Sequence, residues 1–153
     1  EYGATSGGEN SNADVVNVLR ADTNAADALT SGSTPISVNP REVVYLDVPS
    51  VRDNTAPKSG LSSASTTGAN GKAGEWFDPW GSSYVVAIDG NYDGYISLNS
   101  AVLLKYTDLN YITYNGANAV QAGAIAGSWG ADKSQGAGGS MKFQGSDDVL
   151  SWQ

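Results

Sequence analysis

The pattern of apolar and polar positions begins with a polar, glycine-rich lead-in over residues 1–10. Ser11 is followed three residues later by Asp14, which is similar to a capping box at a helix start. Four apolar residues within 15–19 then form a stripe that can bury one face of a helix. The alanine-rich stretch beyond them prolongs this pattern weakly, so we expect a helix over residues 11–30.

Two contrasting segments follow the expected helix. Residues 43–48 (VVYLDV) are mostly β-branched or apolar and end at Pro49. We expect them to be buried, and their pattern leaves open whether they form a helix or a strand. Residues 55–74 are dominated by small and polar side chains, which do not build a packed core. We expect this segment to be a long exposed loop.

Strand patterns dominate from residue 76 onward. Residues 84–88 and 95–98 are joined by a turn rich in Asp, Asn and Gly, which predicts a hairpin. A further strand is expected at 102–106. Residues 111–114 end at Asn115-Gly116, the signal of a type I′ hairpin turn.

The remaining sequence completes the expected sheet. Residues 119–129 favour one more strand, 130–148 form a second glycine-rich loop that contains acidic residues, and 149–152 favour a short apolar strand or tail. A helix followed by an antiparallel sheet over 76–129 predicts an α+β fold. We expect one globular domain over residues 1–153, with long Gly/Ser-rich loops.

Composition narrows the classes of function. Sixteen acidic residues against eight basic ones give a formal charge of -8, which argues against binding to nucleic acid or anionic lipid. The chain has no cysteine and no histidine, which removes the thiolate and imidazole nucleophiles and the usual zinc ligands. No pair of carboxylates stands out for acid-base chemistry, so we expect no catalytic residues. No apolar run of about 18 residues is present to span a membrane.

A first candidate cation site lies between two expected strands. Residues 89–94 (DGNYDG) place the side-chain oxygens of Asp89, Asn91 and Asp93 at alternate positions, as in the first half of an EF-hand loop. The twelfth position is Ser100 instead of a bidentate glutamate, and no helices flank the loop. A turn that uses these residue types for their left-handed conformations remains the alternative.

A second candidate cation site combines Asp132 with Asp147 and Asp148. Adjacent carboxylates repel each other, and a calcium ion bound by several oxygen ligands would remove that repulsion and order the loop between them. The alternative is that these acids are simply solvated.

Trp76, Phe77 and Trp80 form a third candidate site, because clustered aromatic rings can stack on sugars or on a neighbouring subunit. The alternative for these rings is core packing. Aromatic rings beside acidic loops also raise the hypothesis of a calcium-dependent glycan-binding or adhesive module.

Two segments carry a resemblance to a known family. Residues 77–84 (FDPWGSSY) resemble the DPWGxxY segment of the major pseudopilins of type II secretion and of their type IV pilin relatives. Residues 128–132 (SWGAD) and 146–152 (SDDVLSW) are similar to the family's closing pattern. The resemblance covers residues 39–152. It implies a pilin-like head, with an N-terminal helix packed on an antiparallel sheet, that serves as a non-catalytic subunit of an extracellular or periplasmic filament.

The same resemblance implies calcium bound by Asp132, Asp147 and Asp148, with the Trp129 carbonyl as a further ligand. This sequence has Lys133 where the family has glycine, and residues 136–143 lengthen the loop.

The resemblance also implies the partners and the location. Family members begin with a hydrophobic helix that anchors the subunit in the inner membrane and later forms the filament core. We expect that helix to have been deleted or to be supplied by a separate helical pilin chain, and contact with the membrane to occur only through it. The expected partners are further copies of the subunit, other pilins and secretion components, and the expected location is the periplasm or surface of a bacterium.

Overall fold

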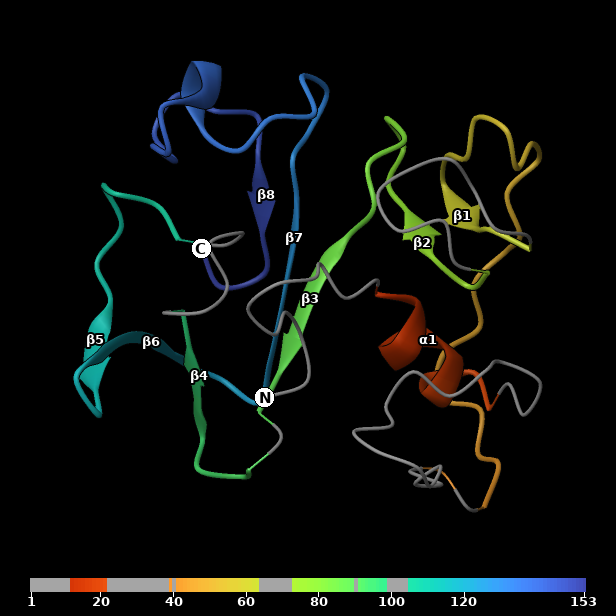
Figure 1. Ribbon diagram of the computed structural model, residues 1–153, viewed down its shortest axis with the longest axis horizontal. Coiled ribbons are helices and arrows are strands. Elements are labelled where there is room, and N and C mark those ends of the chain that lie inside the picture. The colour runs from red at the N-terminus through yellow and green to blue at the C-terminus, as the bar shows by residue number, and fades with distance from the viewer. Residues whose placement is uncertain (1–11, 22–38, 40, 64–72, 90, 99–104) are drawn as a thin grey trace. The chain divides into compact units, whose positions relative to one another are not determined.

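The computed structural model describes residues 12–21, 39, 41–63, 73–89, 91–98 and 105–153 (Figure 1). The chain divides into two compact units. Unit 2 comprises residues 10–83, and unit 1 comprises residues 1–9 together with 84–153. A single domain that spans both units stays a prediction.

Unit 2 contains the helix α1, which spans Ala13–Leu19. The N-cap is Asn12, whose side chain caps no helical amide and instead binds the backbone of Trp76. The helix ends because Ala21 takes a left-handed φ of 56°. The expected helix over 11–30 is therefore wrong at its C-terminal end, and residues 22–30 and Ser11 lie outside the described residues.

A two-stranded antiparallel sheet completes the regular structure of unit 2. It joins β1 (Gly60–Leu61) to β2 (Trp76–Phe77). Leu61 and Phe77 are both buried, with 2% of their surface exposed. The prediction of an exposed loop over 55–74 is wrong at β1, because an isolated apolar residue, Leu61, brings that part of the segment into the core.

Residues 43–48 form neither a helix nor a strand. Val44 is 62% exposed and Tyr45 is 70% exposed, so the prediction that this run is buried is wrong. The amides of Tyr45 and Leu46 both donate to the Leu19 carbonyl, at 2.8 and 3.0 Å. A carbonyl at the end of a helix lacks an intrahelical partner, and here it receives the amides that a sheet would otherwise have used.

Unit 1 contains two three-stranded antiparallel sheets. One has the order β3-β7-β8, with β3 at Val85–Ile88, β7 at Ala124–Ser128 and β8 at Val149–Leu150. The other has the order β4-β6-β5, with β4 at Tyr95–Ser97, β6 at Ala117–Gln121 and β5 at Ile112–Tyr114. The expected hairpin between β3 and β4 is wrong, since these strands belong to different sheets.

The hairpin of β5 and β6 is confirmed. Asn115 and Gly116 both have positive φ, 49° and 76°, as a type I′ turn requires. The single strand expected over 119–129 is divided into β6 and β7. The predicted strand at 102–106 falls mainly on residues 99–104, which lie outside the described residues.

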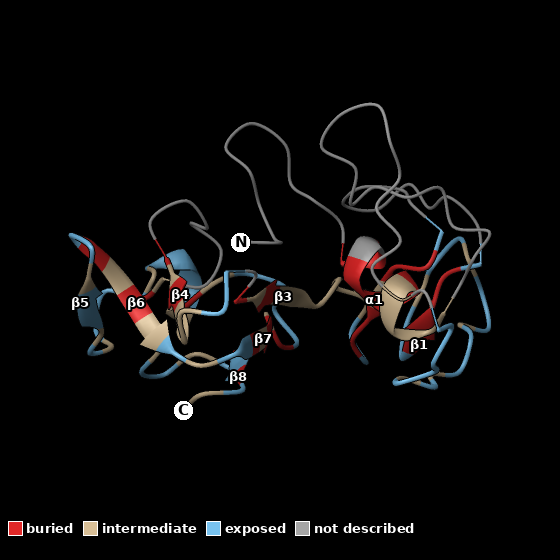
Figure 2. Ribbon diagram, turned by 90° about the horizontal axis from the view of Figure 1, so that it is seen from below, coloured by how far each residue is buried: buried red, intermediate tan, exposed pale blue. Residues whose placement is uncertain are grey.

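The core of unit 1 draws on both of its sheets. Its buried residues are Ala87, Ile96, Leu98, Tyr106, Ile125 and Leu150. Burial alternates along β6, as the pleat of a strand with one covered face requires (Figure 2).

The regular secondary structure of the described residues is mostly β, with three small sheets, α1 and the short 3₁₀ turn η2 (Ala137–Gly139). The predicted α+β fold with an N-terminal helix packed on an antiparallel sheet is wrong. The apolar stripe supports a helix of only seven residues, too short to cover a sheet face. No helix among the described residues is long and apolar enough to cross a membrane.

Candidate functional site in the C-terminal loop

The C-terminal loop, residues 129–148, connects β7 to β8 in unit 1. Its two ends are joined by Asp147, whose Oδ2 accepts the amides of Ala131 and Asp132. Gly130 has a φ of 65°, and a Cβ at this position would overlap the carbonyl and the carboxylate of Asp147. Only glycine fits this approach, so the Gly-Ala-Asp segment and the acidic pair form one structure.

Asp148 lies at the inner side of the loop and is 7% exposed. Its Oδ2 accepts the Tyr106 hydroxyl at 2.8 Å and the Gly136 amide at 2.6 Å, whereas its Oδ1 is buried and has no partner within the described part of the chain. Burial and the neighbouring Asp148 carboxylate raise the pKa of Tyr106, so its hydroxyl keeps the proton that it donates.

Asp108, which precedes the C-terminal loop in sequence, binds the backbone of the loop. Its carboxylate accepts the amides of Gln144 at 2.8 Å and Phe143 at 2.7 Å, and these bonds lower its pKa. Two further hydrogen bonds join the loop to the residues around Asp108. The Thr107 amide donates to the Met141 carbonyl, and the Gln135 side chain donates to the Lys105 carbonyl. The loop is therefore an ordered element fixed by several polar contacts.

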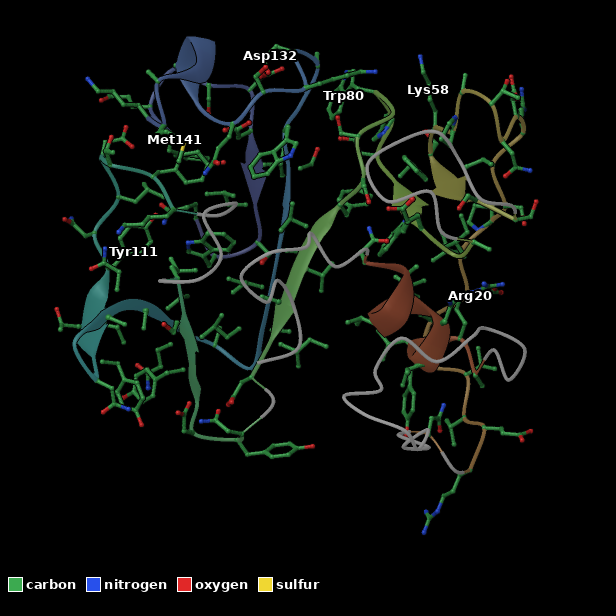
Figure 3. The ribbon with its side chains drawn as sticks, viewed as in Figure 1. Arg20, Lys58, Trp80, Tyr111, Asp132 and Met141 are labelled. Atoms are coloured by element: carbon green, nitrogen blue, oxygen red, sulfur yellow. The ribbon has the colours of Figure 1, made fainter. Side chains whose placement is uncertain are left out.

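The predicted calcium ligands are only partly gathered. Asp132 is exposed, accepts the Ser134 amide at 2.8 Å, and lies on the loop that follows β7 (Figure 3). Within the part of the chain that the structure describes, no three acidic side chains converge as a ligand set. The donor chemistry fits a hard cation, most clearly at the unpartnered Oδ1 of Asp148. The Trp129 side chain packs against the core, and the role of its carbonyl stays a prediction.

The Asp78 turn lies in unit 2 at the DPWG segment. The Asp78 carboxylate is fully buried, and its Oδ1 accepts the amides of Trp80, Gly81 and Ser82 at 2.7–3.0 Å. Asp78 therefore organises the turn that holds these residues.

The predicted contact aromatics around this turn differ in exposure. Phe77 is 2% exposed, so its proposed surface contact is wrong. Trp76 is half-buried, and Trp80 is 38% exposed. Trp80 alone of the three presents much of its ring to solvent, which is little surface for stacking on a sugar.

Unit 2 also holds a polar cavity of about 220 Å³ beside α1. Asn17, Arg20, Leu61, Ser62 and Gly74 are among the residues that line it. Glu75, which follows the lining residue Gly74, is completely buried, and neither of its carboxylate oxygens has a hydrogen-bond partner among the described residues. The cavity is smaller than the usual ligand pocket of roughly 300–1,000 Å³.

Comparison with protein-family models, with curated proteins and with solved structures found no match.

Tyr106 and Asp108 are the site residues that sequence reasoning missed. Their bonds to the C-terminal loop span 42 residues for Tyr106 to Asp148 and 35 for Phe143 to Asp108. No local spacing in the sequence signals such contacts.

Proposed function

We propose that this chain is the head domain of a filament subunit of the type II secretion pseudopilin or type IV pilin kind, and that calcium steadies its C-terminal loop. The observation that carries the proposal is the junction made by Asp147. It joins the two closing segments that resemble the family's pattern, through bonds that span 16 and 15 residues. The two segments of the motif pair therefore form one structural element.

The proposed role is structural. Repeated copies of the head pack around a helical core, in the periplasm or at the surface of a bacterium. An ordered C-terminal loop suits this role because a subunit contact loses less entropy when the loop is already fixed.

Calcium would supply positive charge to a loop that is rich in carboxylates. Asp148 would offer its buried Oδ1, and Asp132 and Asp147 would offer exposed oxygens. These three residues are the ones that would hold the ion, and the hydrogen bonds of Asp147 and Asp148 already hold their carboxylates beside the loop backbone.

Calcium titration of the EDTA-stripped protein tests the metal. We expect Asp132→Ala and the double variant Asp147→Ala/Asp148→Ala each to weaken binding, and we expect calcium to slow protease cleavage within 130–148. Asp53→Asn is the matched control, because Asp53 is an exposed carboxylate that lies in unit 2. Cleavage rates and melting temperature that are identical with and without calcium would contradict this part of the proposal.

Assembly is tested with an antibody raised against this chain and applied to filaments sheared from the producing cells. Regular immunogold labelling along the filaments supports the filament role. Glycan-array binding that disappears in Trp80→Ala, together with unlabelled filaments, would instead favour the glycan-binding module.

A further inference from the structure

The Asp89 loop, residues 89–94, leads from β3 to β4 within unit 1. Asp89 is 7% exposed, and its Oδ2 accepts the Gly94 amide at 2.7 Å, so the carboxylate is directed into the loop. Its Oδ1 is buried and has no hydrogen-bond partner among the residues that the structure describes. A buried carboxylate oxygen without a partner is costly, and a bound cation is one way to offset that cost.

Two more oxygen-bearing side chains lie on the same loop. Asp93 accepts the Asn91 side-chain amide at 2.7 Å and the Tyr95 amide at 2.9 Å. The amides of Gly94 and Tyr95 are neighbours in sequence, and they hold the two carboxylates at the same end of the loop.

We propose that the Asp89 loop binds Ca²⁺ through Asp89, Asn91 and Asp93. Carboxylate and amide oxygens are the donors that calcium prefers, and calcium tolerates the irregular geometry of a loop. Binding replaces the contact between Asn91 and Asp93, because the Asn91 amide oxygen then turns to the ion. The site shares no residue with the C-terminal loop, and it does not depend on the filament function.

The position of the loop gives the ion a structural consequence. β3 belongs to the β3-β7-β8 sheet and β4 to the β4-β6-β5 sheet. Asp89 directly follows β3, and Asp93 lies two residues before β4. An ion held by both carboxylates therefore links the two sheets of unit 1 at one point.

Calcium titration by calorimetry, followed by amide NMR, tests the site on the EDTA-stripped chain. The test variant is Asp89→Asn/Asp93→Asn, because each asparagine keeps an oxygen that can accept the Gly94 or Tyr95 amide. Asp53→Asn is the matched control, since Asp53 accepts the Thr55 amide at 2.8 Å in a similar but exposed turn of unit 2.

We expect binding in the range of about 10⁻⁴–10⁻³ M, as in extracellular calcium modules. The test variant should lose one calcium per chain or weaken that site by about tenfold or more, and the control should bind like the original chain. On titration, the amides of 91–95 should shift.

A second variant, Asp147→Asn/Asp148→Asn, changes only the C-terminal loop. It should still bind the calcium ion of the Asp89 loop and should still show the amide shifts of residues 91–95. Unchanged stoichiometry and affinity in the test variant, shifts confined to 130–148, or no calcium binding by the original chain would each overturn the inference. Failure of the C-terminal site alone would leave it standing.

Discussion

Tyr106→Phe removes one hydroxyl from the centre of unit 1 and leaves the ring in place. The ring packs edge-on against Phe143, with centroids 5.6 Å apart, and this contact does not need the hydroxyl. The substitution removes the 2.8 Å hydrogen bond from the Tyr106 hydroxyl to Oδ2 of Asp148. The other carboxylate oxygen, Oδ1, has no partner among the described residues. A hydrogen bond to a charged group contributes about 1.5–3 kcal/mol, so we expect the free energy of unfolding of unit 1 to fall by that amount in calcium-free buffer.

Hydrogen exchange under native conditions measures this loss, read at the Gly136 amide that Asp148 also binds. Tyr92→Phe makes the same chemical change on a side chain that is 92% exposed, and it should alter stability by less than about 0.5 kcal/mol. A double-mutant cycle with Asp148→Asn should give a coupling energy of about 1–3 kcal/mol. If Tyr106→Phe matches Tyr92→Phe, or if the two changes at 106 and 148 are additive, the account of this bond is refuted.

Two further predictions concern Glu75 and Asp108. Glu75→Met removes a fully buried carboxyl group that has no hydrogen-bond partner among the described residues, so we expect the free energy of unfolding of unit 2 to rise by about 1–3 kcal/mol in urea. A loss of stability would reveal a partner for the carboxyl. The pKa of Asp108 is lower in the folded chain than its unfolded value of 3.8, because of its bonds to Gln144 and Phe143. The bonds therefore stabilise the fold above about pH 4, and this contribution is lost as the pH falls below 3.8 through the folded pKa. Below pH 4, the free energy of unfolding should therefore fall less steeply with decreasing pH in Asp108→Asn than in the original chain. Superimposable acid-unfolding curves of the two proteins would exclude this role.

Local signals in the sequence predicted local structure correctly. Asn115-Gly116 fixed the hairpin of β5 and β6, because its two positive φ angles suit few other residue pairs. Residues 149–152 were expected as a short apolar strand or tail after a glycine-rich loop, and the structure has a strand at Val149–Leu150 only. In the hairpin the deciding interaction lies within a few residues, whereas Val149–Leu150 pairs with Gly127–Ser128 of β7.

Predictions failed where pairing depends on distant residues. β3 pairs with β7, and β4 pairs with β6, although β3 and β4 are neighbours in sequence. Apolar character alone placed residues 43–48 in the core, whereas hydrogen bonds to Leu19 place their backbone at the end of α1 with Val44 and Tyr45 exposed. Strand propensity says little about which partner a strand finds.

In the candidate sites, too, local features could be predicted from the sequence and contacts between distant residues could not. Asp147 and Asp148 could be singled out because they are adjacent acids in a glycine-rich loop. Their partners could not, since Tyr106 reaches Asp148 across 42 residues and carries no local motif. Phe77 was misjudged because its motif says nothing about which of three aromatic rings faces inward.

The strand pairing of unit 1 is nested, which orders its formation in time. β4, β5 and β6 all lie in the stretch of chain between β3 and β7, and their pairs close shorter loops than the pair of β3 with β7. Short loops close at a smaller entropic cost, so the β4-β6-β5 sheet can form first and bring Ile88 towards Ala124. During synthesis, β3 therefore remains unpaired until residues 124–128 have left the ribosome. If translation stalls before that point, the exposed edge of β3 can pair with other chains.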